Sequence, residues 1–521
     1  DCQFVAVSRM SNAASVPAPT GGWNARDSLD DMDANDAVTM VNMIPRSGWV
    51  EARRGSSLYC DLGGSLSPSG ISTLIPYQNT KFLAAYSTSI YDITNPLAPV
   101  PLTHAAFTNS KFQLTAFQSL VILTNGADLA VSYDGTALTD LVVTGHPTGI
   151  FWGCNTFKGR AFYWEENKRS FWFAAAGAYQ GALTEFDLST QCRTGGTLVM
   201  MLTLTVDAGD GVDDFAVFVF STGEALVYQG DDPSNALRWS SSGRFQIGEP
   251  LGIRAHCKVG GTEIILTKDG WLDISTALSG GRLSEASTYS DKIIQAAKSA
   301  ANQYAAFFGW ECLYYPAGNL FIANIPRSAF KAVPGSGGTR WAIESKQHAR
   351  NTSTGAWCEF NGWEATTFAV WKDVLYFASG GYVYTADIGT SDAGDPIYIE
   401  CIPAFNHLGA NGRRKQVTLC AHLTNFGNQE YLVKDGMADY NIIFQNQVVD
   451  APFVGGAAWD VVDWDSAYWA SDDEPLVETT EGWADVSAFG YAVTVSMRAS
   501  LNGFSLKWYG TNYIYRFAGA I

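Results

Sequence analysis

The sequence predicts an all-β protein: a β-propeller of six or seven blades, with an additional β-rich platform or sandwich-like domain from the terminal segments. Two observations lead to this prediction. Pairs of short apolar strands around small turns recur at the interval of a propeller blade. The composition also fits, since aromatic residues reach 13%, charged residues only 16%, and 51 of the 521 residues are glycine. Aromatic side chains suit a pleated sheet, and glycine supplies the positive φ that tight turns need.

The repeat consists of seven pairs of apolar runs, each around a short turn. The pairs are 82–86 with 90–93, 120–123 with 129–133, 161–164 with 171–173, 217–220 with 225–228, 264–267 with 271–274, 313–315 with 320–323, and 374–377 with 382–385. Successive turns lie roughly 40–60 residues apart, which fits a four-stranded blade with insertions. A β-sandwich would not favour this longer period. We expect the propeller at 65–392, an N-terminal platform segment at 1–64 and a C-terminal β domain at 393–521.

One helix interrupts the strand pattern. Ser290 is a good N-cap residue, and Asp291 suits the positive end of the helix dipole. Apolar residues then follow at helical spacing, at positions 293, 294, 297, 301 and 304. We interpret this helix as a packing element beside a blade.

The C-terminal region has longer strand candidates, at 397–402, 416–423 and 491–500, and a Trp/Asp-rich stretch at 459–469. The first 60 or so residues also lie outside the repeat. We therefore expect them to pack with this domain as a platform.

The charge balance limits the functions that the chain can have. Its 51 acidic and 33 basic residues leave a net charge of −18, which argues against tight nucleic-acid binding because phosphates need Lys and Arg. It does not exclude DNA passing nearby, since an acidic wall repels the duplex over about 8 Å at physiological salt. An ordinary acidic soluble protein is the alternative. The low charged fraction favours a subunit whose surface is covered by neighbours, or simply large sheets.

The cysteines and the apolar segments indicate a cellular compartment. The nine cysteines lie far apart, at positions 2, 60, 154, 192, 257, 312, 358, 401 and 420. No C-x₂₋₄-C spacing occurs and the count is odd, which favours free thiols made in a reducing cytoplasm. No apolar run reaches 18 residues, and the N-terminus lacks signal-peptide features. An extracellular destination would then follow from assembly and cell lysis.

We expect no catalytic, cofactor-binding or metal-binding residues. Motifs such as G-x-S-x-G, H-E-x-x-H and the P-loop are absent. The six histidines, at positions 104, 146, 256, 348, 407 and 422, show no metal-ligand spacing. His256 and Cys257 point to opposite faces of a strand, so they cannot form a nucleophile pair with each other. The stretch 31–35 begins like a calcium loop, but Asp36 stands where the loop needs Gly, which favours a polar turn.

A few further residues could belong to a sugar-binding site, a glycosylation site or a charged surface contact. Repeated Asp-boxes are missing, so Asp134-Gly135 and Asp269-Gly270 are interpreted as hairpin turns, while Glu359 beside Trp357 could bind sugar. Asn351 begins a glycosylation sequon, which has no expected role without a signal peptide. The run 413–415, Arg-Arg-Lys, is interpreted as a contact to an acidic neighbouring subunit or as a solvated turn.

Three segments carry a resemblance to a known family. The first comprises 24–27 (Asn-Ala-Arg-Asp), 36–38, 42–45 (Asn-Met-Ile-Pro) and 48–55 (Gly-Trp-Val-Glu-Ala-Arg-Arg-Gly). The second is 350–360 with Gly362-Trp363, 368–370 and 375–377, and the third is 403–406 with Gly409 and 412–415. Together, and in this order, they resemble podovirus (short-tailed bacteriophage) tail proteins, the tail nozzle and packaged-DNA stabilisation family.

This resemblance implies a non-enzymatic structural virion protein, a subunit of a homohexameric tail nozzle. Such a ring closes the DNA exit channel, retains packaged DNA and conducts it during genome ejection. The implied partners are the tail adaptor protein, contacted by segment 1–64, tail fibres or tailspikes, genomic DNA in the lumen without sequence-specific binding, and the host envelope. The implied location is the virion tail, assembled in the bacterial cytoplasm. The alternative is a carbohydrate-binding or glycan-hydrolysing propeller that acts as a receptor-binding tail component.

Overall fold

The structure, a computed structural model, describes residues 11–63, 70–207, 212–279, 288–329, 331–335, 338–426, 431–450 and 480–517. The chain forms two compact units. The propeller unit comprises Leu58–Gln347 and Trp363–Ala386, and the terminal unit comprises Asp1–Ser57, His348–Gly362 and Asp387–Ile521.

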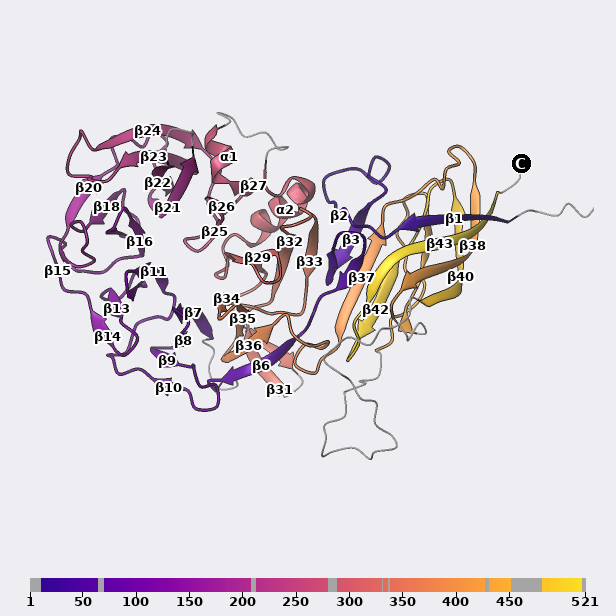
Figure 1. The fold of residues 1–521 in the computed structure, drawn as a ribbon, viewed down its shortest axis with the longest axis horizontal. Helices are drawn as coiled ribbons and strands as arrows, with labels where there is room; N and C mark the ends of the chain where they lie inside the picture. The colour runs from indigo at the N-terminus through magenta and orange to yellow at the C-terminus, as the bar shows by residue number, and fades with distance from the viewer. Residues whose placement is uncertain are drawn as a thin grey trace, which may run out of the picture. The chain divides into compact units, whose positions relative to one another are not determined.

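The propeller unit is a ring of antiparallel sheets, which are its blades (Figure 1). The first four sheets are four-stranded. They are β7 (Ile71–Tyr77), β8 (Lys81–Tyr86), β9 (Ser89–Asp92) and β10 (Val100–Pro101); β11 (Gln113–Phe117), β12 (Leu120–Thr124), β13 (Val131–Tyr133) and β14 (Leu138–Asp140); β16 (Gly153–Phe157), β17 (Arg160–Trp164), β18 (Ser170–Phe173) and β20 (Thr184–Asp187); and β21 (Leu198–Asp207), β22 (Val212–Phe220), β23 (Glu224–Gly230) and β24 (Trp239–Gln246).

Three more blades complete the ring. They are β25 (His256–Val259), β26 (Thr262–Thr267) and β27 (Gly270–Asp273); β28 (Glu311–Tyr315), β29 (Leu320–Pro326) and β32 (Ser345–Asn351); and β34 (Thr367–Trp371), β35 (Val374–Ser379), β36 (Tyr382–Ala386) and β6 (Ser56–Asp61). The described residues therefore form seven blades, and the predicted propeller is confirmed. Two small ladders lie outside the blades: β15 (Val143–Thr144) with β19 (Gly181–Ala182), and β30 (Lys331–Gly335) with β31 (Gly338–Ala342).

The ring closes through strand exchange between its two ends. Strand β6 precedes the first blade in the sequence but adds to β36 of the last blade. Two further hydrogen bonds go to the turn between β35 and β36. Ile71 N–H, at the start of β7, donates to Gly380 O at 2.7 Å, and Leu62 N–H, just after β6, donates to Gly381 O at 3.0 Å. Because the first and last blades share these bonds, neither end can leave the ring without losing a sheet edge.

Apolar layers between successive blades form the core. One layer joins the first two blades and contains Ile75, Leu83, Ile90, Phe112, Val121, Leu123 and Val131. Another layer joins the third, fourth and fifth blades, and the Phe171 and Phe218 rings stack in it with centroids 4.6 Å apart. Since each sheet buries both faces, its strands are apolar runs rather than alternating ones. This is why the sequence repeat was visible as short apolar pairs.

All seven predicted pairs are hydrogen-bonded hairpins. In six blades the pair is the second and third strand, whereas β28 and β29 are the first and second strand of theirs.

The predicted helix is present as a 3-10 turn, η2 (Asp291–Ile293), followed by α2 (Ile294–Tyr304); a short helix α1 (Ile274–Ser279) precedes them. Of the five predicted inner positions, 293, 294, 297 and 301 are buried, whereas Tyr304 is half-buried. The predicted capping role of Ser290 is wrong, because its side chain makes no cap hydrogen bond. Its hydroxyl instead accepts the N–H of Trp271 at 3.0 Å and ties the helix start to β27.

The terminal unit contains two larger sheets. One has the order β4 (Met43–Pro45), β5 (Val50–Ala52), β43 (Lys507–Phe517), β38 (Lys415–Thr424) and β40 (Thr480–Gly490), with β1 (Asn12–Pro17) on β43. The other contains β33 (Trp357–Phe360), β3 (Asp36–Val41), β37 (Ile397–Pro403) and β42 (Met497–Leu501), with β2 (Gly22–Trp23) on β3. A small ladder pairs β39 (Gly436–Ala438) with β41 (Val493–Val495).

Two of the three predicted C-terminal strands are present, as β37 and β38. The third, at 491–500, is two strands, because the chain changes partner at Ser496: β41 pairs with β39, whereas β42 pairs with β37. The Trp/Asp-rich stretch 459–469 lies outside the described residues. Neither helix of the described part has the length and apolar character of a membrane span.

The bounds of the units differ from the expected domains in three places: residues 58–63 belong to the propeller unit, and residues 348–362 and 387–392 belong to the terminal unit. The segment 348–362 lies within the range expected for the propeller. There Glu359 pairs with Val41 in parallel, and Asn42 N–H donates to Glu359 O at 2.7 Å. This long-range pairing, which local periodicity does not record, decides the assignment.

Candidate functional site

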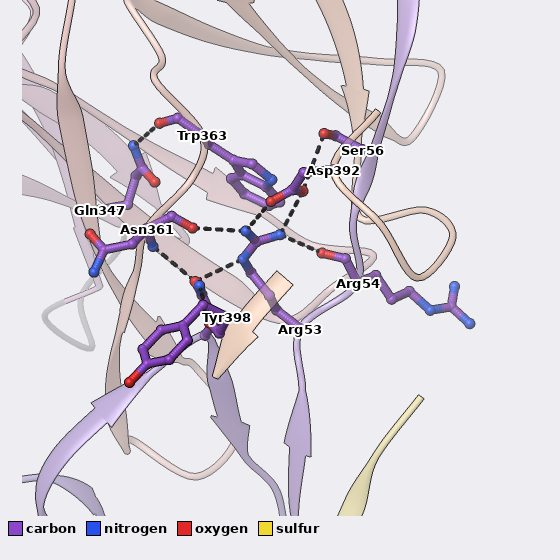
Figure 2. Close-up of polar contacts among 9 residues, drawn as sticks. Arg53, Arg54, Ser56, Gln347, Asn361, Trp363, Asp392 and Tyr398 are labelled. Carbon is purple, nitrogen blue, oxygen red and sulfur yellow. Dashed lines mark hydrogen bonds and ion pairs between the residues drawn. The ribbon is translucent and has the colours of Figure 1, made fainter. Parts of the chain in front are cut away.

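A polar cluster of the terminal unit surrounds the side chain of Arg53, which is only 1% exposed (Figure 2). Its Nη1 and Nη2 donate to the two carboxylate oxygens of Asp392, at 2.9 and 2.5 Å. Nη1 also donates to Arg54 O at 2.9 Å, and Nη2 to Asn361 O at 2.8 Å. Nε donates to Asn42 Oδ1 at 2.8 Å.

These contacts use every donor that the Arg53 guanidinium has, since the group carries five N–H bonds in a planar fork. The bidentate pairing with Asp392 is the strongest geometry available to an arginine and a carboxylate. A guanidinium with no remaining donor cannot bind a substrate or an anion without breaking a contact it already makes. The chemistry of this cluster is therefore that of a structural junction.

Asn42 is the second centre of the junction. It adopts φ of 54° between β3 and β4, a left-handed conformation that Asn tolerates better than most residues. Its Oδ1 accepts Asn361 N–H at 2.8 Å as well as Arg53 Nε, and its Nδ2 donates to Tyr398 O at 2.7 Å. Segments more than 300 residues apart in the sequence meet at this amide.

Other residues of the resembling segments also make internal contacts. Asn24 Nδ2 donates to Asp27 Oδ2 and Asp36 Oδ2, both at 2.8 Å. Glu51 accepts Arg46 Nε at 2.8 Å and Trp49 Nε1 at 3.0 Å. These polar side chains are satisfied within the unit, so they hold loops in place rather than await a ligand.

The histidines and cysteines do not gather into a site. Among the described residues, no group of three or more His, Cys, Asp or Glu side chains could hold a metal ion. His256 Nδ1 lies 2.9 Å from Glu263 Oε2 and His104 Nε2 lies 3.1 Å from Asp140 Oδ1, each a single pair. The eight described cysteines are free, and burial raises the pKa of Cys154 to about 12. A thiol with that pKa is a poor nucleophile near neutral pH.

His422 is the histidine with the most perturbed environment. It is fully buried in the terminal unit, with Nδ1 at 2.7 Å from Thr511 Oγ1 and Nε2 at 3.2 Å from Ser496 O. Burial, with the nearby Lys434, lowers its pKa to about 3. The ring is therefore neutral under ordinary conditions and acts as a hydrogen-bonding core residue.

The predicted turns are present. Asp134 Oδ1 accepts Thr136 N–H and Ala137 N–H at 2.8 and 2.9 Å, and the bonds of this turn lower its pKa to about 2. Gly270, after Asp269, has φ of 123° at the start of β27. In the calcium-like stretch, Asp33 Oδ1 accepts Asn35 N–H at 2.8 Å, as in a simple polar turn.

The remaining surface candidates also have structural partners. Asn351 is 1% exposed and donates to Pro45 O at 2.8 Å, so the sequon is closed to modification. Arg414 lies over the Tyr491 ring at 5.2 Å, and Lys415 is buried with Nζ 2.7 Å from Tyr491 O. Glu359 accepts Asn361 Nδ2 at 3.0 Å.

The Arg53 junction was not predicted from the sequence as a cluster. Arg53 and Asn42 lie in the first resembling segment, but no spacing connects either of them to Asp392. A covarying pair would be the only sequence signal for such a contact.

Comparisons with known proteins concern the propeller. No protein-family model matches the chain, and no curated protein matches it. The β-propeller domain of Cps50 (Swd1) from Myceliophteria thermophila aligns with 64% of this chain and 99% of its own length, at 8% identity and a TM-score of 0.39. The computationally designed protein Ika8 aligns with 64% of this chain and all of its own length, at 10% identity and a TM-score of 0.35. YCF48 from Cyanidioschyzon merolae aligns with 62% and 96%, at 8% identity and a TM-score of 0.35.

Proposed function

We propose that this chain is a structural, non-enzymatic virion protein, one subunit of the hexameric tail nozzle of a short-tailed bacteriophage. In this role it closes the DNA exit channel, retains packaged DNA and conducts it during genome ejection. The proposal starts from the three resembling segments.

The observation that carries the proposal is how the polar residues of those segments are used. Asn24, Asn42 and Arg53 each direct their side chains to partners within the terminal unit, and Arg53 has no donor left. An enzyme or a binding protein would leave some polar groups of its characteristic segments unsatisfied and facing a ligand. Segments that serve only as junctions support an architectural role.

The charge supports the same role. A net charge of −18 per subunit gives a ring that repels DNA, so the duplex would slide rather than adhere. The proposed partners are further copies of the chain, the tail adaptor protein, tail fibres or tailspikes, and genomic DNA without sequence-specific contacts. The host envelope is a further proposed partner, and the proposed location is the virion tail, assembled in the bacterial cytoplasm.

The test is the stoichiometry of the assembly. Light scattering after size-exclusion chromatography would measure the mass of the purified chain alone and with the adaptor protein, and low-resolution imaging of the particle would locate it. We expect six copies on the tail axis. A chain that stays monomeric in both mixtures and is absent from the particle would refute the proposal.

A second function, sugar binding by a receptor-binding tail component, has one observation in its favour. Alternate residues of β40 are exposed, which places Trp483, Asp485 and Phe489 on one face, with Trp483 47% exposed and Phe489 51%. Exposed aromatic faces beside a carboxylate suit sugar rings. A glycan array with the Trp483→Ala variant as its comparison decides this: binding that Trp483→Ala abolishes favours this second function.

A further inference from the structure

The propeller unit holds a second polar cluster, at one end of its axis. The innermost strands, among them β7, β11, β25 and β34, lie around the axis (Figure 1), and β28 contacts β25 and β34. Because blades repeat by rotation about this axis, the first residues of these strands lie at the same end. Charged residues near that end include Lys111, Arg254 and Glu311.

Arg254 reaches across the axis. It precedes β25 in the fifth blade, yet its Nη1 donates to Ser72 O of the first blade at 2.8 Å. Its Cζ lies 4.8 Å from the centre of the Phe308 ring, and Lys111 Nζ, from the second blade, lies 4.5 Å from the centre of the same ring. Two cations from different blades therefore share one aromatic ring, with the attraction that ring faces offer cations.

Two polar atoms of this cluster are enclosed without a hydrogen-bond partner among the described residues. They are Arg254 Nη2 and Glu311 Oε2, each shut off from solvent. Glu311 accepts hydrogen bonds from the Thr367 hydroxyl and the Phe368 N–H. An enclosed N–H group of a guanidinium without an acceptor is costly, because it gives up its hydrogen bond to water and makes none in return.

The charges here favour an anion as the missing partner. Burial raises the pKa of the Glu311 carboxyl, with Arg254 opposing that shift. Two cations, Lys111 and Arg254, stand beside the single carboxyl group of Glu311, and Arg254 Nη2 still lacks an acceptor. This contrasts with Arg53, whose five donors are all used.

We propose that this end of the propeller axis binds a small oxyanion, a phosphate or carboxylate group, through Arg254 Nη2 with Glu311 and Lys111 beside it. The oxyanion would give Arg254 the second bond of its fork, the geometry that arginine prefers with planar or tetrahedral oxyanions. Such a site links the first, second, fifth and sixth blades through one ligand. It goes beyond the proposed architectural role and does not depend on it.

Equilibrium dialysis of the full chain against radiolabelled inorganic phosphate, with ionic strength held constant by NaCl, tests the site. We expect saturable binding of one phosphate per chain, weakened at least tenfold by Arg254→Met and several-fold by Lys111→Met. Lys258→Met is the matched control, an exposed lysine on β25, and should leave binding unchanged. Lys111 is exposed, so its variant tests the site even if Arg254→Met disturbs folding.

Competition separates the two sources of the oxyanion. Acetate and a short DNA oligonucleotide compete for labelled phosphate in parallel arms: displacement by acetate favours a carboxylate from a protein, and displacement by the oligonucleotide favours a nucleic-acid phosphate. The absence of saturable phosphate binding, or binding that Lys111→Met and Arg254→Met both leave intact, would overturn the proposal.

Discussion

Replacing Arg53 by methionine is expected to destabilise the terminal unit by about 3 kcal/mol. The substitution keeps the aliphatic volume but removes the charge of the Arg53 side chain, which is 1% exposed. The carboxylate of Asp392, whose side chain is 13% exposed, is then left without its cationic partner. Breaking a buried ion pair by removing one partner costs roughly 3–5 kcal/mol, because an uncompensated charge remains. Asp392 retains the Ser56 hydroxyl at 3.3 Å, and Asn42 Oδ1 retains the Asn361 N–H, so the lower end applies.

Arg54 provides a matched control one residue away. It is exposed, and only its backbone carbonyl takes part in the junction. Arg54→Met should therefore change the unfolding free energy by less than about 0.5 kcal/mol. Adding Asp392→Asn to Arg53→Met should recover part of the loss, about 1–2 kcal/mol, because the stranded charge disappears.

Urea unfolding followed by far-UV circular dichroism measures these differences. Hydrogen exchange in peptides covering residues 36–54 and 357–362 then gives the local readout. If Arg53→Met and Arg54→Met unfold within about 1 kcal/mol of each other, or the double variant is no more stable than Arg53→Met, the junction does not stabilise the unit as argued.

Three other predictions concern single side chains. Burial lowers the pKa of His422 to about 3, so the unfolded chain takes up a proton below about pH 6.5 that the folded protein does not, and about 2 kcal/mol of stability is lost at pH 5. His422→Gln should reduce this dependence of stability on pH in thermal melts at pH 5 and 7.5. Burial raises the pKa of Glu224, but hydrogen bonds from the loop at 192–194 outweigh it and lower the pKa to about 2, so Glu224 contributes stability above about pH 4.5 that disappears towards pH 2. Glu224→Gln should remove this dependence of the unfolding free energy on pH between 4.5 and 2, and an unchanged dependence contradicts the assignment. A Cβ at Gly270, where φ is 123°, would lie 2.6 Å from Ile294 Cδ1, whereas a Cβ at Gly260, where φ is 64°, would meet open space. Gly270→Ala should therefore lower the free energy of urea unfolding by about 2 kcal/mol more than Gly260→Ala. Equal losses would show that the helix moves away freely.

The propeller could be predicted because its evidence is local. Both faces of each blade are buried, so the paired strands are apolar runs, and a turn that contains glycine, such as Thr124–Gly126, marks five of the seven hairpins. The buried face of α2 could also be predicted from the sequence, because the apolar residues at 294, 297 and 301 follow helical spacing and are buried. Ser290 was a local error, because its hydroxyl has a better partner in Trp271, a contact that comes from tertiary packing.

The polar clusters could not be predicted because their members are distant in the sequence. Arg53 and Asp392 are 339 positions apart, and Arg254 and Ser72 are 182 apart. Composition and charge showed only that such residues exist. The pairing of a given arginine with a given carboxylate or carbonyl depends on which loops the folded sheets bring together.

The amino-acid sequence by itself determined the β class, the blade-length period, the packing helix after Ser290 and the acidic balance, since each depends on neighbours within one or two elements. The tertiary structure alone decided the closure of the ring by β6, the break at Ser496, the membership of residues 348–362, and the different situations of Arg53 and Arg254. The physical reason is that strand pairing and charge burial are long-range events. Their partners are chosen when the chain folds, by the geometry of the sheets rather than by adjacent residues.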